Sequence, residues 1–227
     1  MLWLTIYVES VAEYRYTEHI LKYMDLWVKS MYAFGALLMR MNYISRWGLM
    51  RNARTETLSE HVLITATIAN ILGYIARDIF GADVDPERIT CRAIYHDAGE
   101  ILNGDLPTPV KYRNDTIRDA YMKLERESEE RILESLPEAL KDSMRTAIVG
   151  EGLSEREEQI VKAADRFSAL IKCIEEEQSG NTEFATAKSS TLKKIKTDML
   201  PETEYFLEHF IPAYTLTLDE LLLDKGL

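Results

Sequence analysis

The side chains best suited to chemistry are two histidines that lie near carboxylates. The chain of 227 residues has four histidines, and His61 and His96 both fall in segments with the apolar period of core helices. Asp97 follows His96 directly, and Glu100 lies one helical turn further on. Divalent transition metals prefer imidazole nitrogen and carboxylate oxygen, and separate helices can present such ligands toward one point. These residues form a candidate metal site.

Asp165 is a further carboxylate in an unusual place. It interrupts the apolar segment 160–170, where neighbouring alanines indicate close helix packing. Because desolvating an unpaired carboxylate costs several kcal/mol, a buried aspartate needs a cation or a metal as its partner. Taken singly, His61 is equally an ordinary residue of a first helical turn, and the His96-Asp97 pair is equally a chance dipeptide. The candidate site therefore depends on all of these residues meeting at one cation.

Helices must position these side chains, because apolar residues recur at spacings of three and four along most of the chain. Thr57 with Glu60, and Ser154 with Glu157, form capping boxes, and Asp85-Pro86 is a further helix start. Loops are predicted at 51–56 and 104–109, from their polarity and their Gly and Pro residues. The predicted helices cover residues 31–46, 57–75, 86–101, 120–133, 138–149 and 154–178, followed by two or three more with boundaries at Pro201 and Pro212. The fold class is all-α.

Composition limits the partners and the compartment. With 27 Lys and Arg against 38 Asp and Glu, the net charge of −11 argues against a polymeric nucleic acid but allows a small phosphate ligand. No positively charged leader precedes the apolar start, and no apolar run approaches the ~18 residues of a membrane span, so no membrane partner is expected. Cys91 and Cys173 are expected to be buried thiols, which points to a reducing cytoplasm. Residues 1–30 are a Tyr-rich extension of uncertain status, and 31–227 are expected to form a single domain.

The motifs resemble a known family. His61, His96-Asp97 and Asp165 match the H…HD…D signature of HD-domain metal-dependent phosphohydrolases, which specifies only the superfamily. The short motifs around these residues are more specific and resemble those of the bacterial 5′-deoxynucleotidases: ISRWGLMRNARTE at 44–56, SEH at 59–61, YHDAGE at 95–100, GDLPTPVKY at 104–112, VKAAD at 161–165 and NTEF at 181–184. The likeness runs from about Met31 to Glu220.

The resemblance implies an HD-domain helical bundle, with the metal site in its central helices, that acts as a homodimer. The implied reaction is hydrolysis of deoxyribonucleoside 5′-monophosphates to deoxynucleoside and phosphate. The implied metal ligands are His61, His96, Asp97 and Asp165. In the implied catalytic pair, Glu100 orients or activates the attacking water and Asp105 lies beside the leaving oxygen. His-rich ligation favours Co²⁺, Mn²⁺ or a similar ion over Mg²⁺.

The substrate contacts that the resemblance implies are an arginine for the phosphate and an aromatic ring on the sugar. Arg46 matches the first, and Trp47 matches the ring that disfavours a 2′-hydroxyl. Lys111 could only supplement Arg46 as a point charge, and Thr108 is a further candidate on the same loop.

Several of these residues have a purely structural alternative. Trp47 could be a core aromatic that anchors its loop, Arg46 could pair with Glu56, and Asp105 could simply form a turn after Gly104. The remaining two histidines and one acidic run are expected to be structural or at the surface: His19, His209 and Glu175 to Glu177.

Two other functions remain open at this stage. One is an HD phosphohydrolase acting on a deoxynucleoside triphosphate or a guanosine tetraphosphate alarmone, which would call for more basic residues than Arg46, Arg51, Arg54 and Lys111 offer. The other is a non-catalytic HD module that binds a nucleotide. A missing ligand or a missing Glu100 would favour that module, and all of them are present.

Overall fold

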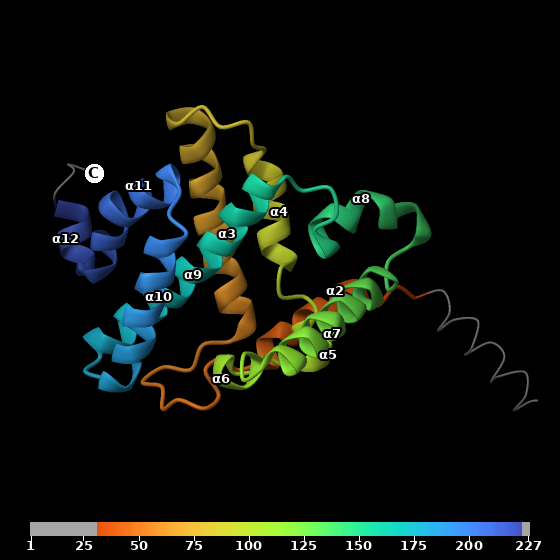
Figure 1. The fold of residues 1–227 in the computed structure, drawn as a ribbon, viewed down its shortest axis with the longest axis horizontal. Helices are drawn as coiled ribbons and strands as arrows, with labels where there is room; N and C mark the ends of the chain where they lie inside the picture. The colour runs from red at the N-terminus through yellow and green to blue at the C-terminus, as the bar shows by residue number, and fades with distance from the viewer. Residues whose placement is uncertain (1–30, 224–227) are drawn as a thin grey trace, which may run out of the picture. The chain divides into compact units, whose positions relative to one another are not determined.

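Three helices form the centre of the domain in the computed structural model, which describes residues 31–223. They are α3 (Leu58–Tyr74), α4 (Pro86–Tyr95) and α9 (Glu155–Gln178), and they pack against one another (Figure 1). Around them lie α2 (Phe34–Leu38), α5 (Glu100–Asn103), α6 (Thr108–Lys111), α7 (Asp115–Leu133), α8 (Glu138–Val149), α10 (Ala185–Thr197), α11 (Pro201–His209) and α12 (Leu218–Leu223). Within residues 31–223 the only β feature is one isolated bridge, between Ser45 and Thr57. The all-α prediction is confirmed, while the expectations for residues 1–30, His19 included, fall outside the described residues.

The predicted helix starts are confirmed at atomic detail. Thr57 caps α3 in a capping box with Glu60, and Ser154 caps α9 in the same way with Glu157. At α4 the Asp85 side chain accepts from the backbone N–H groups of residues 87 and 88, and Pro86 follows in the first turn. Each such cap satisfies backbone donors that the helix itself leaves free, and stabilises it by ~1 kcal/mol.

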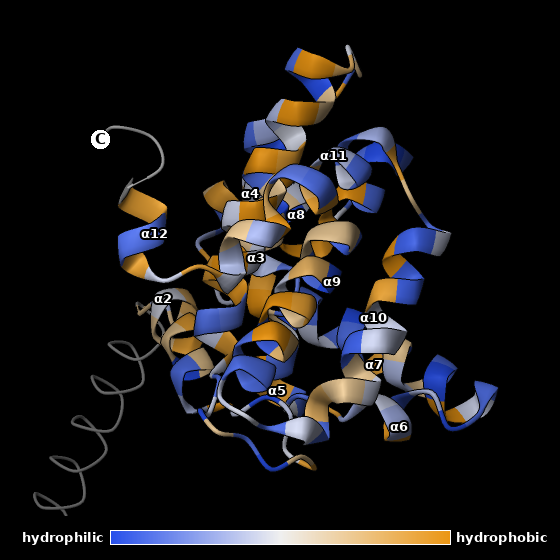
Figure 2. Cartoon of the chain, turned by 90° about the vertical axis from the view of Figure 1, so that its left-hand side faces the viewer, coloured by the Kyte–Doolittle hydropathy of each residue, from blue (hydrophilic) through white to orange (hydrophobic). Residues whose placement is uncertain are grey.

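Two clusters of buried apolar side chains meet along α3. One cluster joins α3, α4, α9 and α11, and includes Ala66, Ile68, Phe167 and Phe206. The other lies under α2, α7 and α8, and its α3 members are Leu58 and Val62. Figure 2 shows the apolar and polar stretches that alternate along these helices. The first turns of α3 therefore pass from one core to the other, and His61 lies just before that change, between Leu58 and Val62.

The first predicted helix, residues 31–46, is wrong in its extent. It is α-helical only to Leu38 and continues as the 3₁₀ helix η1 (Met39–Tyr43). The chain then turns extended because the Arg46 N–H donates to the Glu56 carbonyl at 2.9 Å, and the Leu58 N–H donates to the Ile44 carbonyl at 2.9 Å. These long-range backbone bonds leave no sequence period behind.

The predicted helix over 86–101 is also interrupted, at the residues that matter most. It ends at Tyr95, and residues 96–99 form a turn before α5 begins at Glu100. The N–H groups of Ala98, Glu100 and Ile101 each bond to the carbonyl three residues back, which is a tighter winding than that of an α-helix. His96 and Asp97 thus lie on a turn between two helices.

Other boundaries moved by a few residues. The predicted loop 104–109 is shortened because Thr108–Lys111 forms α6, and α7 begins at Asp115, earlier than predicted, because the Asn114 side chain caps its first turn. The last part of the chain holds η3 (Thr182–Phe184) and η4 (Ile211–Thr215) besides its three α-helices. Cys173 is buried as expected, but Cys91 is exposed.

One helical stretch, Leu58–Ile79, is long and apolar enough to cross a membrane by length and composition alone, contrary to the expectation that no run approaches that length. It comprises α3 and the π-helical turn η2 (Ile75–Ile79). Half of its most apolar window is buried inside the domain, against α4 and α9. A buried core helix meets the same criterion, so this finding reflects the central place of α3.

Glu157 allows a direct test of how α9 is held. Its Oε1 accepts from the Asp85 N–H at 3.1 Å and from Arg88, and its Oε2 accepts from the Ser154 N–H at 2.8 Å and from Arg88 Nη2 at 2.7 Å. In Glu157→Gln an amide N–H₂, which can only donate, replaces one of the two accepting oxygens and faces its former donors. We expect an unfolding free energy lower by ~1–3 kcal/mol, which corresponds to a melting temperature lower by ~2–4 °C per kcal/mol. Thermal melts followed by circular dichroism measure this, and an unchanged melting temperature would contradict it.

Candidate metal centre

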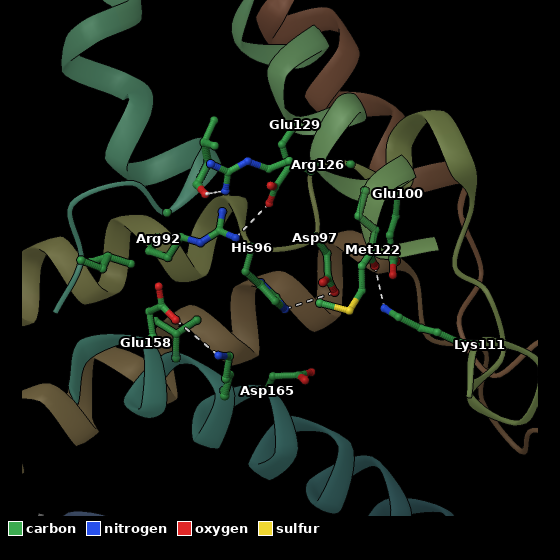
Figure 3. Close-up of a pocket in the computed structure, with 17 residues that line it drawn as sticks. Arg92, His96, Asp97, Glu100, Lys111, Met122, Arg126, Glu129, Glu158 and Asp165 are labelled. Atoms are coloured by element: carbon green, nitrogen blue, oxygen red, sulfur yellow. Dashed lines mark hydrogen bonds and ion pairs between the residues drawn. The ribbon is translucent and has the colours of Figure 1, made fainter. Parts of the chain in front are cut away.

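Side chains from three separate segments meet beside the 96–99 turn. His61 of α3 is fully buried, and its Nε2 lies 3.2 Å from Asp165 Oδ1 of α9 and 3.5 Å from Asp97 Oδ2. His96 Nε2 lies 3.1 Å from Asp97 Oδ2. One potential ligand atom each from His61, His96 and Asp165 falls within 4.8 Å of the other two. In Figure 3, Asp165 projects from α9 on the opposite side of the cavity from His96 and Asp97.

The hydrogen bond of His96 favours a lone pair directed at this meeting point. His96 Nδ1 lies 2.8 Å from the Ala93 carbonyl, which can only accept, so the hydrogen belongs on Nδ1. His96 Nε2 is then left buried with no hydrogen-bond partner. His61 Nδ1 lies 3.0 Å from the Ser168 hydroxyl, which leaves its Nε2 toward the carboxylates. A buried nitrogen without a partner, close to two aspartates, fits a ligand of a divalent cation.

The carboxylates of the cluster are ionised. Burial alone would raise the pKa of Asp97, but the neighbouring imidazoles His96 and His61 hold it well below its usual range. Burial would likewise raise the pKa of Asp165, and the hydrogen bond from His61 lowers it instead. Anionic oxygen and imidazole nitrogen together form a donor set that suits first-row transition ions better than Mg²⁺.

Asp97 also faces Arg46, which joins the cluster to the segment before α3. Arg46 Nη1 lies 3.5 Å from Asp97 Oδ2, and Arg46 Nε lies 3.5 Å from Glu56 Oε2. Burial would lower the pKa of Arg46, but the charges of Asp97, Asp165 and Asp105 raise it, so the guanidinium stays charged. Arg46 therefore pairs with Glu56, as the structural alternative predicts, and contacts the cluster at the same time.

Glu100 is buried beside the cluster with its Oε2 unbonded. It lies three residues after Asp97 in the tight turn, and residues three apart share a face there. Burial, together with the negative charges of Asp97 and Asp105, raises the pKa of Glu100 to about 10. A buried carboxyl with a strongly shifted pKa, next to potential metal ligands, is a candidate for proton transfer.

Trp47 has the one positive φ, +58°, among the non-glycine residues from 31 to 223. Such a conformation costs ~1–3 kcal/mol and persists only where the surroundings enforce it. Its Nε1–H donates to Glu56 Oε2 at 2.9 Å, and its ring packs on Phe184 with centroids 5.1 Å apart. Trp47 therefore makes the contacts expected of an aromatic residue that anchors its loop. The same contacts fix the position of its ring, one residue after Arg46.

The loop residues after α5 differ in position. Asp105 is half-buried after Gly104, close enough for its charge to act on both Glu100 and Arg46. Lys111 Nζ donates to Glu125 Oε1 at 2.6 Å and reaches the same cavity as the metal cluster. Thr108 is exposed at the start of α6 and does not line that cavity.

The cavity beside the cluster has a volume of about 550 Å³ and a wall that sequence reasoning missed (Figure 3). This wall is formed by α7, whose residues Met122, Arg126 and Glu129 line the cavity. Glu129 is buried and accepts from Arg92 Nη2 at 2.9 Å. The spacing 122, 126, 129 puts these residues on one helix face. This spacing is the feature of the sequence that could have indicated a shared cavity wall.

Of the remaining positions expected at the surface, some are exposed and one is buried. His209 is exposed and packs on Tyr205 in a tilted arrangement, with ring centroids 4.4 Å apart. In the acidic run, Glu175 and Glu177 are exposed as expected, but Glu176 is buried. Its acceptors are occupied by backbone N–H groups of the 51–56 loop and by Lys172, which is why it is buried as an ion pair.

Comparison with known proteins agrees with this geometry at the level of fold. An HD-domain phosphohydrolase from Listeria innocua superposes with a TM-score of 0.69 at 23% identity, covering 80% of this chain and 87% of that one. A cyanophage S-2L HD phosphohydrolase, described as bound to dA and one catalytic Zn²⁺ ion, gives a TM-score of 0.55 at 16% identity over 76% of this chain and 90% of that one. The fold is therefore that of the HD-domain phosphohydrolases.

Sequence relatives are closer. A 5′-deoxynucleotidase of Erwinia tasmaniensis is 45% identical over 188 residues, which are 83% of this chain and 95% of the relative. A 5′-deoxynucleotidase of Yersinia pestis is 42% identical over 192 residues, 85% of this chain and 98% of the relative. Residues 33–214 match the sequence profile described as 5′-deoxynucleotidase YfbR-like. The chain therefore belongs to the YfbR-like 5′-deoxynucleotidase family.

Proposed function

We propose that this chain hydrolyses deoxyribonucleoside 5′-monophosphates to deoxynucleoside and phosphate, with a divalent cation held by His61, His96, Asp97 and Asp165. The observation that carries the proposal is the convergence of two imidazoles and Asp165, with His96 Nε2 buried and unbonded. The 5′-deoxynucleotidase relatives, which this chain covers almost completely, support the same substrate class.

The donor set favours Co²⁺, Mn²⁺ or a similar transition ion over Mg²⁺. A cation bound there supplies positive charge that stabilises the phosphate dianion and lowers the pKa of nearby water and of Glu100. A Zn²⁺ ion is described in the cyanophage protein of the same fold, which supports a divalent cation in general terms.

The chain's own residues divide the remaining work. Glu100, buried at the edge of the cluster, takes the proton of the attacking water. Asp105, on the loop after α5, takes up a proton from solvent before the reaction and gives it to the 5′-oxygen as it leaves. Arg46 holds phosphate oxygens in the fork of its guanidinium, and the ring of Trp47 covers the sugar where a 2′-hydroxyl would lie. Lys111 contacts the substrate from α6, whereas Thr108 lies outside the cavity wall and is assigned no contact.

The charge balance of the cavity favours a monophosphate over the larger alternatives. Lys111 is paired with Glu125, and Arg92 with Glu129. Lys162 is paired with Glu158, so among the described residues of the cavity wall only the cation of Arg126 has no carboxylate partner. A triphosphate or an alarmone would need several cations free for phosphate. The presence of Glu100 beside the complete ligand set argues against the non-catalytic alternative.

The organisation of the protein is also proposed. Residues 31–227 form one domain after an extension at 1–30, and the protein works as a cytoplasmic homodimer on a small-molecule substrate. Support for the domain comes from the relatives, whose nearly complete length is covered by 188 to 192 residues of this chain.

Metal removal is the first test. A ligand that binds only the folded state at 100 times its dissociation constant adds ~2.7 kcal/mol to stability. Treatment with a chelator should therefore abolish phosphate release and lower the melting temperature by ~5–10 °C. Added Co²⁺ or Mn²⁺ should restore both. Undiminished turnover in protein shown to be metal-free by elemental analysis would contradict the proposed cation.

Glu100→Gln tests the proton acceptor. The amide keeps the shape of the side chain but cannot take a proton, so kcat for dAMP should fall by ~10²–10⁴-fold. The cation content measured by mass spectrometry should stay at the wild-type value. Glu157→Gln, which also removes a buried carboxylate, should keep kcat. Activity of Glu100→Gln near that of the wild type would move this role to another group.

Trp47→Ala tests the sugar contact. Loss of the ring should reduce the preference for dAMP over AMP, measured as a ratio of kcat/KM values, by ~10-fold or more. Trp47→Phe, which keeps a ring on Phe184 but loses the hydrogen bond to Glu56, should retain most of the preference. Equal preference in wild type and Trp47→Ala would show that discrimination arises elsewhere.

A further inference from the structure

A buried ion pair near the C-terminal end of α9 has no role in the mechanism above. Lys172 and Glu176 lie one turn apart, with 2% and 1% of their surfaces exposed, and they form an ion pair. Burying two charges costs several kcal/mol of desolvation, which the attraction between them repays only with good additional hydrogen bonds. The partners of those extra bonds identify what the pair does.

The pair binds the backbone of the loop at 51–56. Glu176 Oε2 accepts from the Ala53 N–H at 2.7 Å, and Oε1 accepts from the Arg54 N–H at 3.3 Å. Lys172 Nζ donates to the Arg54 carbonyl at 2.5 Å. Asn181, just beyond the helix, donates both to the Arg51 carbonyl at 2.8 Å and to Glu176 Oε2 at 2.6 Å. In Figure 1 this loop runs in orange beside the end of α9.

Burial would raise the pKa of Glu176, but Lys172 and these N–H donors lower it to about 2. The carboxylate is therefore ionised at neutral pH, and each of its oxygens accepts from two donors. A loop without regular structure is in this way fixed through its main chain.

The loop passes this constraint to the substrate residues through Glu56. Glu56 is buried, its carbonyl accepts from the Arg46 N–H at 2.9 Å, and its Oε2 accepts from Trp47 Nε1. Phe184, in η3 just after Asn181, packs on the Trp47 ring and also lies under Lys172 Nζ, at 5.7 Å from its centroid. The end of α9 therefore reaches Trp47 along two paths, and Trp47 holds an unfavourable φ that needs such support.

We propose that Lys172 and Glu176 are positioning residues, which hold the 51–56 loop so that Arg46 and Trp47 face the phosphate and the sugar. This inference rests on the proposed function, since it acts through the roles given there to Arg46 and Trp47. Neither residue touches substrate. Loss of the pair shifts Trp47 and weakens the preference for deoxyribose, while His61, His96 and Asp165 keep their cation.

The test is an isosteric exchange with a matched control. Both oxygens of Glu176 accept from donors, so Glu176→Gln must set an amide N–H₂ against one pair of them. Glu157 lies at the other end of the same helix, is equally buried and also accepts on both oxygens. The chain has three tryptophans, Trp3, Trp27 and Trp47. Each exchange is made in full-length protein carrying Trp3→Phe and Trp27→Phe, so that Trp47 is the only tryptophan left.

Two readouts are taken for each variant, the fluorescence of Trp47 without substrate and the kinetics with dAMP and AMP. For Glu176→Gln we expect emission at longer wavelength, easier quenching by acrylamide, and kcat/KM for dAMP lower by ~10- to 100-fold, as a ~1 Å misplacement would produce. The preference for dAMP over AMP should fall, and cation content should stay constant. Glu157→Gln should lose stability but leave emission and preference unchanged.

The outcomes separate cleanly. Unchanged emission and preference in Glu176→Gln, or equal changes in Glu157→Gln, would overturn the inference. If the parent protein cleaves no deoxynucleotide, the proposed function fails while the fluorescence comparison still decides whether the pair positions Trp47. If circular dichroism shows that Glu176→Gln does not fold, Lys172→Met, which removes the donor to the Arg54 carbonyl, takes its place with the same expected results.

Discussion

An imidazole nitrogen buried among carboxylates, with no hydrogen bond of its own, is the constraint on which the rest of the structure depends. His96 Nε2 is such a nitrogen, and His61 Nε2 and Asp165 lie with it inside a 4.8 Å limit. Leaving a buried polar group unpaired costs ~1–3 kcal/mol, and gathering two carboxylates beside it adds their mutual repulsion. A divalent cation would remove both penalties at once, which is the physical reason for the metal centre proposed here.

The fold serves this centre by bringing three distant stretches of chain to one junction. The α3 helix supplies His61 just before it passes from one apolar core to the other, α9 supplies Asp165 from its middle, and the tight turn after α4 supplies His96 and Asp97. The turn is decisive, because neighbours on a regular helix diverge by ~100°. Its three-residue winding puts Glu100 on the same face as Asp97, beside the cluster.

Local signals in the sequence were enough for much of the fold. Thr57, Asp85 and Ser154 begin their helices as predicted, because a cap depends on a few adjacent residues and leaves a recognisable pattern. The residues of the cluster could be proposed from the sequence because they match the HD signature and are flanked by recognisable motifs. What could not be predicted depends on contacts between segments far apart in the chain. The 3₁₀ turn after Tyr95 and the backbone bridge near Ser45 leave no period, and Glu176 looks like its exposed neighbours until its partners at Ala53 and Arg54 are seen.

The most direct test of the central claim is a crystal structure with Mn²⁺ or Co²⁺, in which anomalous scattering locates the ion independently of the protein atoms. We predict one peak per chain, within ~2.0–2.2 Å of His61 Nε2, His96 Nε2 and an Asp165 carboxylate oxygen. A peak bound to only one of the two imidazoles, or a cation held at another place in the domain while these side chains keep their positions, would contradict it.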